Sequence, residues 1–587
     1  MRLVIVRRLS QVFFFLLLLW FAVVATVGTS WWQWRGWPIN WLLELAPLTA
    51  VATFLATGTI YGRLLWGLLT LVGTAFLGRF FCGFVCPLGS LNQFLGWLAR
   101  RRLRPEERVA ANRFSGNQQV KYSFLVFFLI LAGLGTLQTG LMDPLPLMYR
   151  SVNLAVLPLL DSKLHGPRFY ASVWLLGSVF VLVAALNFLR PRFFCRYLCP
   201  LGALFGFLAA LSPFRIGKQR AGKCGDCRLC EEYCEGACRP SEEIILGECV
   251  LCLNCLDRCP TGRITYAGRP SLAGEKGLPD LSRRGLILAG TGFVLAPLWH
   301  RGGLSGDNRN PLLLRPPGSL AEDQFLARCI RCGQCMRVCP ANIIQPALWT
   351  AGIQGLWSPV LNYRLGRSGC QPTCIACGQV CPTAAIRPLS VAEKMGLEEF
   401  AEQGPCRIGT AFIERGRCLP WAMDRPCLVC QEVCPVSPKA IFPRLAFEVI
   451  RDGGDLEAWM FGREIEMAAP LPTGVNLASG DYFVGIMAQP ELGLRRILRH
   501  HDDRLVVEGP PAPSGMPAER VSLDIVVKLE RPYVDPSRCI GCGMCERECP
   551  VSGQRAIRVF NENESRAQAG RLLVGGMGNR DKGRVAG

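Results

Sequence analysis

The amino-acid sequence predicts a multidomain protein in which an α-helical membrane bundle precedes small α+β domains organised around cysteines. Two observations carry this prediction. The first 190 residues contain three uncharged stretches of about 20 residues, the length that spans a bilayer, and no such stretch follows residue 299. Most of the 30 cysteines fall into spaced groups of four that end in Cys-Pro. A chain of 587 residues is long enough for about three or four domains.

Residues 1–212 form the expected membrane domain, with about four transmembrane helices. Gln11–Ser30, Tyr122–Met142 and Phe169–Leu189 each have the length of a span. Leu64–Phe81 is expected to span as well, and Leu45–Gly62 to lie in the membrane or to enter it partly. Arginines flank the inner ends of these stretches, so both ends of the domain are expected in the cytoplasm. Much of the net charge of +20 has this position, and nucleic acid is therefore not an expected partner.

Two near-identical stretches, RFFCGFVCPLGSL and RFFCRYLCPLGAL, form an internal repeat in this domain. They carry a C-x3-C-P motif each, with Cys82 and Cys86 in the first and Cys195 and Cys199 in the second. Two spans separate the motifs, so both are expected on the same face of the membrane. Together they can supply four thiolates to one further metal or cluster, or form two structural or redox-active dithiols. The sequence leaves both readings open.

Residues 213–270 contain two cysteine runs with the spacing of two-cluster ferredoxins, C-x2-C-x2-C-x3-C. In that arrangement the fourth cysteine of each run binds the cluster of the other run. One predicted set is therefore Cys224, Cys227, Cys230 and Cys259, and the other is Cys249, Cys252, Cys255 and Cys234. Glu235, not proline, follows Cys234, so Cys238 is an alternative fourth ligand. Zinc is the other metal that such quartets bind, but doubled runs of this spacing favour iron–sulfur clusters.

Residues 271–300 contain the stretch Leu281–Trp299, in which Arg283 and Arg284 precede an uncharged run. This is the order of parts in a twin-arginine export signal. No clear cleavage site follows, so we expect an export-like anchor that stays attached. A stop-anchor or a buried helix is the alternative, because the run is shorter than a full span.

Residues 301–587 contain four further quartets, each ending in Cys-Pro, and an insert at about 440–530. The same crossed pairing predicts four sets of ligands, which are Cys329, Cys332 and Cys335 with Cys381; Cys370, Cys374 and Cys377 with Cys339; Cys418, Cys427 and Cys430 with Cys549; and Cys539, Cys542 and Cys545 with Cys434. The fold class is thus completed by α+β ferredoxin-like iron–sulfur domains, with six [4Fe-4S] clusters in all. The insert is rich in β-formers such as DYFVGIM and RVSLDIVVKL and is expected to form a few strands. Cys406 is left over as an ordinary thiol.

The sequence contains no motif that indicates haem or a dinucleotide cofactor. There is no C-x-x-C-H for a c-type haem, and none of the four histidines lies within one of the three uncharged stretches. The GTGFVL segment follows no strand and departs from a dinucleotide fingerprint. Glu44, Asp143, Asp161 and His165 are candidate proton acceptors near the outer edge of the membrane domain, although such residues are more often solvated or capping groups.

At this point the motifs resemble known families. The paired C-x3-C-P motifs with the first ferredoxin module resemble NapH-type membrane subunits of quinol dehydrogenases. The twin-arginine start followed by four quartets resembles MauM/NapG-type four-cluster ferredoxins, so nearly the whole chain resembles a fusion of the two. The resemblance implies a multi-pass protein of the bacterial inner membrane that takes electrons from the quinol pool. Its C-terminal ferredoxin domain would be periplasmic and would pass the electrons to a periplasmic reductase or redox partner.

The C-x3-C-P motifs also resemble those of regulatory and maturation proteins related to NosR. An iron–sulfur membrane protein that serves the maturation or regulation of a periplasmic metalloenzyme is therefore the alternative reading. The flavin-binding portion of NosR is not apparent in this sequence.

Overall fold

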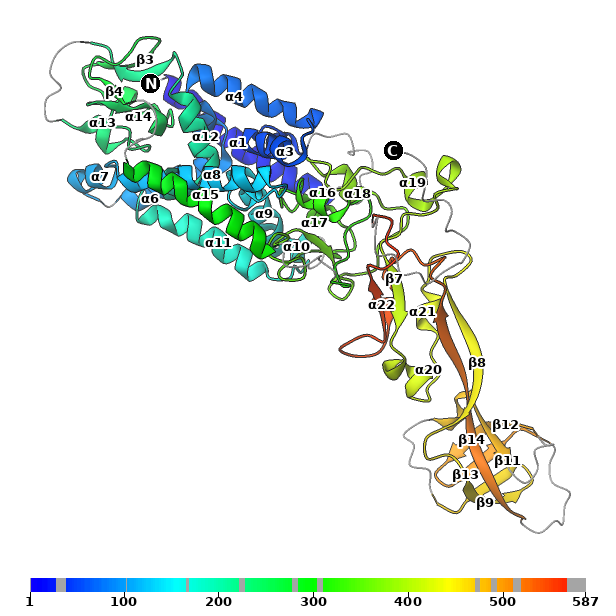
Figure 1. Cartoon of the computed structure of the whole chain (residues 1–587). Helices are drawn as coiled ribbons and strands as arrows, with labels where there is room; N and C mark the ends of the chain where they lie inside the picture. Colours follow the sequence, from blue (N-terminus) through cyan, green and yellow to red (C-terminus); the bar gives the residue numbers. More distant parts are fainter. Residues whose placement is uncertain are drawn as a thin grey trace. The chain divides into compact units, whose positions relative to one another are not determined.

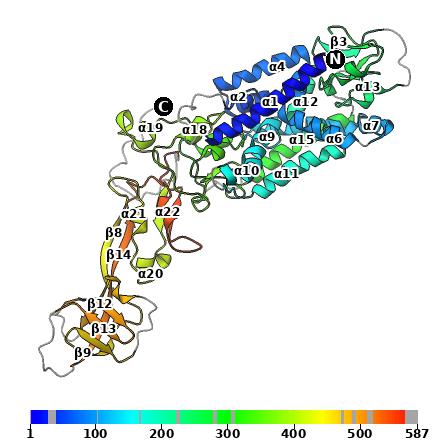
Figure 2. The ribbon, with the colours of Figure 1, turned by 180° about the vertical axis from the view of Figure 1, so that it is seen from behind.

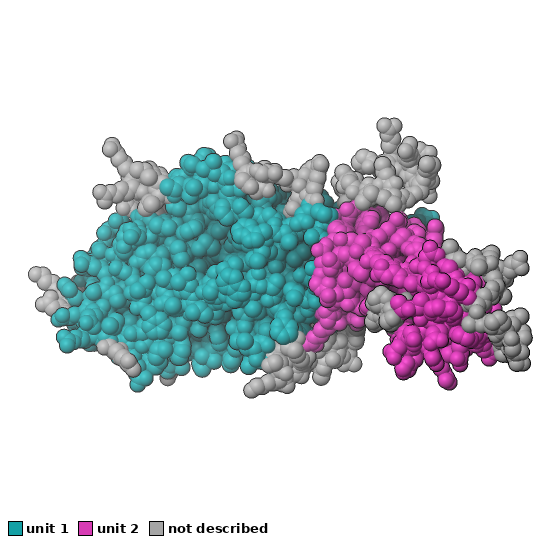
Figure 3. Space-filling model, turned by 90° about the horizontal axis from the view of Figure 1, so that it is seen from below, with its two compact units in different colours: residues 1–365, 373–406, 566–568 teal, residues 366–372, 407–565, 569–587 magenta. Residues whose placement is uncertain are grey.

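The computed structural model describes residues 2–27, 39–101, 103–164, 168–220, 227–276, 283–303, 310–469, 476–486, 493–509 and 519–566. The chain divides into two compact units, coloured separately in Figure 3. Unit 1 comprises residues 1–365, 373–406 and 566–568, and unit 2 comprises residues 366–372, 407–565 and 569–587.

Unit 1 is built mainly from helices. Those of the first 212 residues are α1 (Arg2–Val27), α2 (Trp41–Glu44), α3 (Pro47–Thr57), α4 (Trp66–Leu77), α5 (Phe80–Phe84), α6 (Pro87–Arg100), α7 (Pro105–Ala111), α8 (Val120–Gly133), α9 (Pro144–Ser151), α10 (Leu157–Leu164), α11 (Val173–Ala185) and α12 (Pro200–Ala209). Within the described parts of the chain, one helix is long and apolar enough to cross a bilayer, over Leu3–Ala25.

The helices differ from the expected spans in their length. The helix expected over Tyr122–Met142 ends at Gly133, and Gly135 follows with a left-handed backbone (φ +86°). The helix expected over Leu64–Phe81 ends at Leu77, before Gly78 (φ +81°). Glycine in this conformation ends a helix although apolar residues continue beyond it. The prediction of four full-length helices was therefore wrong in these boundaries.

The other two boundaries also need correction. The expected Phe169–Leu189 helix is α11, Val173–Ala185, followed by one 3-10 turn. The first helix begins at Arg2 instead of Gln11, because Arg7 is buried and donates hydrogen bonds to Gln93 and Asn254. Residues 28–30 of the expected span lie outside the described residues.

The helices of unit 1 expose an unusual amount of apolar surface. Large apolar side chains that are more than 40% exposed occur on α1 (Leu9, Phe13, Trp20), α4 (Trp66, Leu69, Phe76), α11 (Trp174, Val181, Leu182) and the later helix α15, Arg283–Gly303 (Phe293, Val294, Leu298). Soluble monomers rarely leave large apolar patches in contact with water. This surface therefore fits an apolar environment or a protein partner.

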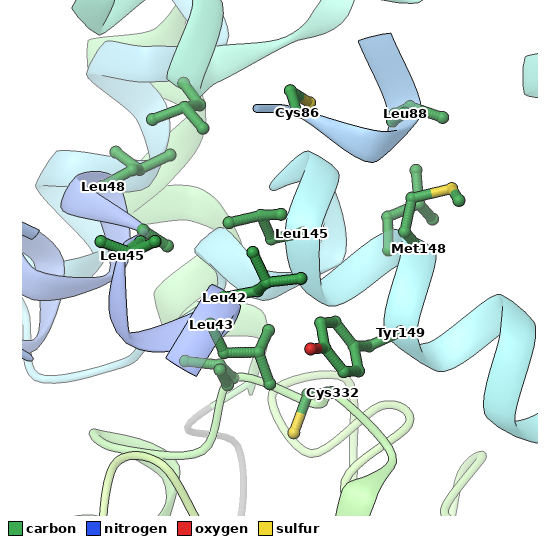
Figure 4. Packing of buried hydrophobic residues seen from close by; sticks show 14 of the residues in the cluster. Leu42, Leu43, Leu45, Leu48, Cys86, Leu88, Leu145, Met148, Tyr149 and Cys332 are labelled. Carbon is green, nitrogen blue, oxygen red and sulfur yellow. The ribbon is translucent and has the colours of Figure 1, made fainter. Parts of the chain in front are cut away.

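The buried core of the helical part continues into the cysteine run Cys329–Cys339. Leu42, Leu43 and Leu145 pack in one cluster with Tyr149 and Cys332 (Figure 4). Leu18, Phe21 and Ala22, near the C-terminal end of α1, belong to the same cluster. The Cys329–Cys339 region is thus packed onto the helices within unit 1.

The first ferredoxin module lies at the opposite end of α1 (Figures 1 and 2). Its elements are β1 (Arg215–Lys218), α13 (Leu229–Glu232), β2 (Ile244–Ile245), α14 (Asn254–Arg258), β3 (Ile264–Ala267) and β4 (Glu275–Lys276). Strand β1 pairs antiparallel with β3, and β2 pairs parallel with β4. Val4 of α1 is buried with Cys230, Cys234 and Ile244 of the module. Helix α1 has 26 residues, so about 39 Å of helix separates its two ends.

The expected anchor is part of helix α15, Arg283–Gly303, which packs against α8. Ala296 is buried with Phe128 and Leu131. A Cβ atom on Gly292 would lie 2.4 Å from the carbonyl oxygen of Ser123, so the two backbones approach closely and only glycine fits. One side of the helix is thus buried and the other exposes apolar residues.

The later part of unit 1 has short elements only: α16 (Glu322–Leu326), α17 (Gln334–Val338), β5 (Ile344–Pro346), β6 (Pro359–Leu361), α18 (Ala376–Gln379) and α19 (Val391–Met395). Strands β5 and β6 pair antiparallel. Helices α16, α17 and α18 lie at the C-terminal end of α1 in Figure 1.

Unit 2 combines short cysteine-bearing elements with a larger sheet. The former are β7 (Thr410–Ile413), α20 (Leu419–Ala422), α21 (Val429–Glu432), α22 (Met544–Glu548) and β15 (Ile557–Phe560), with β7 and β15 paired. The sheet contains β8 (Ile441–Val449), β9 (Leu456–Phe461), β10 (Glu464–Met467), β11 (Tyr482–Ile486), β12 (Arg495–His501), β13 (Arg504–Val507) and β14 (Glu519–Val534). Its order is β11-β12-β13-β10-β9-β14-β8, and β11 also pairs with β14, which closes six strands around a buried core. The two stretches expected as strands fall in β11 and β14.

Candidate iron–sulfur centres

Cysteines from different runs meet at three cavities. Cys329, Cys332 and Cys335 line one cavity together with Cys381. A second is lined by Cys418, Cys427, Cys430 and Cys549, and a third by Cys434, Cys539, Cys542 and Cys545. Each cavity therefore has three cysteines of one run and the last cysteine of another. This is the arrangement that crossed closure of a two-cluster ferredoxin requires.

The loops that carry three cysteines share one backbone form. In the runs that begin at Cys249, Cys329 and Cys539, the N–H groups two residues beyond the first and second cysteines donate to those cysteines' sulfurs. Residues with left-handed backbone recur at equivalent positions, at Leu251 and Leu253, Arg331 and Gly333, and Gly541 and Gly543. The local chain thus directs amide hydrogens at the sulfurs, which favours thiolates.

Burial opposes the thiolate form at the same sites. It raises the pKa of Cys252 and of Cys542 to about 12, although the neighbouring N–H groups lower it. A buried thiolate is stable only beside a positive charge, and a bound iron ion supplies that charge. The donor set therefore fits [4Fe-4S] clusters. By contrast, among the described residues no group of three or more His, Cys, Asp or Glu side chains is arranged to hold a single metal ion.

The predicted quartet that contains Cys339 is divided between the two units. Cys374 is close enough to Cys339 to act on its charge, and Cys377 acts in the same way on Cys335. These residues belong to unit 1. Cys370 belongs to unit 2, where its N–H donates to the carbonyl oxygen of Cys542 at 2.7 Å.

In the first module, five cysteines, Cys238 among them, lie close together. The sulfurs of Cys234 and Cys238 are 3.4 Å apart, and the Cys238 N–H donates to the Cys234 sulfur at 3.3 Å. The Cys238 thiol also donates to Cys249. Its hydrogen bond lowers the pKa of Cys234 to about 7. Cys252 and Cys255 are buried beside them, so either Cys234 or Cys238 is placed to be the fourth ligand.

The other set of this module is described only in part. Cys224 lies outside the described residues. Cys230 is buried and lies near Cys227, which is exposed. Cys259 is half-buried, and N–H groups that follow it lower its pKa against the effect of burial.

The four cysteines of the C-x3-C-P motifs come together in unit 1. Cys82, Cys86 and Cys195 all act on the charge of Cys199. The Cys86 sulfur accepts a hydrogen bond from the Gly89 N–H (3.4 Å) and thereby caps α6. In the same way, the Cys199 sulfur accepts from the Gly202 N–H (3.1 Å) and caps α12. The repeat in the sequence therefore produces two equivalent helix starts that face each other.

The repeat explains the shape of each helix start. In both Cys-Pro-Leu-Gly segments the cysteine has the extended backbone of an N-cap residue, and proline occupies the first helical turn. A Cβ atom on Gly89 would lie 2.8 Å from the carbonyl oxygen of Cys82. On Gly202 it would lie 2.9 Å from the Arg79 guanidinium. Only glycine fits these positions without displacement.

Buried arginines connect this group to the first module, and the sequence analysis missed them. Arg192 donates to the Glu235 carboxylate at 2.7 Å and to the carbonyl oxygen of Cys82 at 3.3 Å. Arg79 donates to the carbonyl oxygen of Gly247 at 2.8 Å. Both arginines are the first residue of an RFFC stretch, and their place in the repeat could have indicated that they have a structural role. Burial raises the pKa of Cys195, and Arg192 opposes this effect.

Of the candidate proton acceptors, two have described side chains. Glu44 is buried, and burial raises its pKa. Asp143 is fully buried and caps α9 through the Leu145 N–H, and burial raises its pKa to about 7. Its second oxygen has no hydrogen-bond partner. The side chain of Asp161 and the whole of His165 lie outside the described residues.

Polar contacts hold the cysteine run Cys329–Cys339 against the helical core. The spacing of the cysteines did not indicate these contacts. Arg331 donates to the carbonyl oxygen of Leu137, and Arg150 donates to that of Arg331. Asn40 donates to the carbonyl oxygen of Val380 at 2.8 Å. These contacts lie within unit 1, so this cysteine site and the helices form one structure.

Comparison with known proteins gives matches to the cysteine segments. Residues 59–106 and 171–219 match a family model described as a 4Fe-4S binding domain, and residues 326–345 and 532–552 match a second model with that description. The first pair of segments contains the C-x3-C-P motifs. The chain therefore carries ferredoxin-type 4Fe-4S domains. The second pair of segments contains two of the runs predicted to bind clusters, whereas the first pair contains motifs for which the sequence left a cluster open.

Three relatives illustrate the similarity. The ferredoxin-type protein NapH of Haemophilus influenzae is 28% identical over 252 residues, which cover 40% of this chain and 80% of the relative. The methylamine utilization ferredoxin-type protein MauM of Methylophilus methylotrophus is 34% identical over 22% of this chain and 52% of the relative. The regulatory protein NosR of Pseudomonas aeruginosa is 32% identical over 31% of this chain and 24% of the relative. No solved structure matches.

Proposed function

We propose that the chain is a membrane-bound iron–sulfur protein that oxidises quinol and passes the electrons to a periplasmic redox protein or reductase. In this proposal it joins a NapH-type part and a MauM/NapG-type part in one chain. The observation that carries the proposal is the meeting of cysteines from separate runs at three cavities, together with cysteine sites at both ends of α1. Matches to 4Fe-4S binding domains and to NapH and MauM support it.

The cofactors in this proposal are six [4Fe-4S] clusters. Bound there, each would carry one electron at a time. In the outer part, three would be held by the cysteines that line the cavities and one by Cys370, Cys374, Cys377 and Cys339. In the first module, one would be held by Cys224, Cys227, Cys230 and Cys259, and one by Cys249, Cys252 and Cys255 with Cys234 or Cys238. Buried apolar side chains such as Ile330 and Met336 exclude water from the first cavity.

The order of sites in unit 1 suggests the direction of the route. Val4 packs on the first module, and Phe21 packs near Cys332 at the other end of α1. The four C-x3-C-P cysteines adjoin the first module through Arg192 and Glu235, and Cys86 and Cys199 belong to the same buried cluster as Cys332. A further redox centre at these four cysteines would connect the two ends.

The proposed location is the bacterial inner membrane. The length of α1 and the exposed apolar faces of α1, α4, α11 and α15 support this placement. The arginine-rich loops favour the first module on the cytoplasmic side. The outer quartets would then be periplasmic, in agreement with the order of parts in Leu281–Trp299.

The test is anaerobic stopped-flow absorbance of the purified full-length protein mixed with reduced menaquinone or ubiquinone analogues. We expect the cluster absorbance to bleach, and iron and sulfide analysis of the same sample to give about 24 irons per chain, four for each of six cubanes. More iron would implicate Cys82, Cys86, Cys195 and Cys199 as ligands. A zinc-dominated metal content would overturn the electron-transfer proposal.

The similarity to NosR supports a second candidate, a maturation or regulatory factor for a periplasmic metalloenzyme. Such a factor needs clusters but no sustained turnover. If dithionite reduces the clusters and no quinol does, while deletion of the gene leaves a partner enzyme unassembled, the second candidate replaces the first.

A further inference from the structure

A cavity of about 910 Å³ lies between α1, α6 and the first module, in the region of α6, α7, α13 and α14 in Figure 1. Its volume is within the range of small-molecule sites, about 300–1,000 Å³. All its lining residues belong to unit 1. The sequence analysis did not indicate it, because its walls come from three separate segments.

One side of the cavity is apolar and reaches the outer surface of the helices. Val12 and Leu16 of α1 and Phe94 and Trp97 of α6 line this side, and each is more than half exposed. On α1 these residues lie on the candidate membrane span, Leu3–Ala25. A ligand that enters here is therefore a lipid-soluble molecule that arrives from the apolar phase.

The other side of the cavity is polar and carries neutral amides. The side-chain oxygen of Gln93 accepts from Gln11 at 2.7 Å and from Arg192 at 3.2 Å, which fixes the orientation of the Gln93 amide. Asn254, on the module, donates to Glu235 at 3.1 Å and to the carbonyl oxygen of Tyr233 at 3.2 Å, so its amide hydrogens already have acceptors in the protein and it forms part of the wall. Amide groups of this kind recognise hydroxyl and carbonyl oxygens on a ring.

The charge at the polar end is positive. Arg8, Arg100, Arg101, Arg108 and Arg258 line the cavity, and Glu232, Glu235 and Asp257 are the acidic residues there. Glu235 pairs with Arg192, and Glu232 pairs with Arg108 at 3.0 Å. The excess of guanidinium groups favours the deprotonated form of a bound phenolic hydroxyl, and that form gives up electrons more readily.

The cavity adjoins a cysteine site. Tyr233 and Glu235, which line it, flank Cys234, and Asn254 precedes Cys255. Within unit 1, a ligand in this cavity thus lies beside the sulfurs proposed to hold a cluster. An anionic phospholipid would also fit the arginines, but its binding would not require a position beside a redox centre.

We propose that this cavity is the quinol site, with the ring at the Gln93 amide and the isoprenoid tail between α1 and α6. The proposal rests on the proposed function. In the step, quinol loses two electrons and the protons of its two O–H bonds and becomes quinone. Two [4Fe-4S] clusters, held by the cysteine sets proposed above, would supply the acceptors, one electron to each. The protons leave to water at the polar mouth.

The test narrows the apolar entrance without disturbing the core. In the full-length protein, Val12→Trp and Leu16→Trp are combined, and Leu9→Trp with Phe13→Trp is the matched control. The control residues are also four apart on α1 and more than half exposed, but they do not line the cavity. Binding of a hydroxyquinoline N-oxide quinol analogue is measured by fluorescence quenching, and cluster reduction by a menaquinol analogue is measured by stopped-flow absorbance.

We expect the Val12/Leu16 double variant to lose at least about tenfold in analogue affinity and in the rate of reduction by quinol, with full reduction by dithionite. The control should match the wild type. Equal rates in both double variants, or an equal loss in both, would overturn the proposed site. So would displacement of the analogue by phosphatidylglycerol but not by menaquinone, which would identify a phospholipid site. If the wild type reacts with dithionite and with no quinol, it is the proposed function that fails.

Discussion

The ion pair between Arg192 and Glu235 allows a quantitative test of the connection between the C-x3-C-P motifs and the first module. The Arg192 Nε and the Glu235 carboxylate are 2.7 Å apart, and the two side chains are 1% and 3% exposed. In Arg192→Met, the Glu235 carboxylate keeps its burial and loses its closest cation. Coulombic attraction by Arg192 is also the main cause that lowers the pKa of Glu235 against the effect of burial.

The expected cost follows from this burial. Removal of one partner of a buried ion pair costs about 3–5 kcal/mol, because an uncompensated charge remains inside. At about 1.4 kcal/mol per factor of ten, this corresponds to a loss of protection of roughly a hundredfold to several thousandfold. The double variant Arg192→Met/Glu235→Gln removes both charges and should recover at least a tenfold part of that loss.

Anaerobic hydrogen exchange with mass spectrometry measures this protection on peptides that cover residues 244–256. Arg239→Met is the control, because its pair with Glu242 has a separation of 3.9 Å and side chains that are 41% and 66% exposed. Exposed pairs contribute about 0–1 kcal/mol, so the control should lose less than about fivefold. An Arg192→Met protein that exchanges like the control would refute the inference that a buried pair joins the two parts.

Two further predictions concern single residues. Burial raises the pKa of Asp143 from 3.8 to about 7, so between these values the folded state holds a proton that the unfolded state releases, and stability falls as pH rises. Asp143→Asn keeps a helix cap without charge and should remove this slope, worth about 3 kcal/mol between pH 5 and 7, from unfolding curves measured at about pH 5 to 8. A slope that persists in the variant would contradict it. In crossed closure, Cys549 and Cys418 bind the same cluster, so Cys549→Ser and Cys418→Ser should lose the same component of the Mössbauer spectrum. If instead Cys549→Ser and Cys545→Ser lose the same component, the cysteines of one run bind one cluster.

The cysteine groups could be predicted from the sequence because their geometry is local. Three cysteines spaced by two residues lie in one tight loop, and the last cysteine of a paired run closes the set. Cys381 and Cys549 lie at the cavities that this rule assigns to them. The rule is weaker where a turn intervenes, and Cys238 competes with Cys234 for that reason.

The helix lengths could not be predicted from hydropathy because the helices end for reasons of backbone conformation. Gly58, Gly78 and Gly135 adopt left-handed conformations within apolar sequence, and each stands at or just beyond the end of a helix. The buried arginines were hidden for a related reason. In the sequence, Arg79 and Arg192 look like the flanking charges that orient a membrane span. Their partners are distant in the sequence, Gly247 for Arg79 and Glu235 and Cys82 for Arg192, and become neighbours only in the fold.

The position of the Cys329–Cys381 site suggests a physical reason for joining the helical part and the ferredoxin-like part in one chain. If the membrane part and the ferredoxin part were separate proteins, each electron transfer between them would require an encounter. Here the Cys329–Cys381 site is packed on the helices through Arg331 and Arg150, and both belong to unit 1. In the proposed function, the Cys329–Cys381 site would therefore be held beside the helical part at a high effective concentration, independent of how much protein is present. This contact would keep electron transfer between the helical part and that site intramolecular.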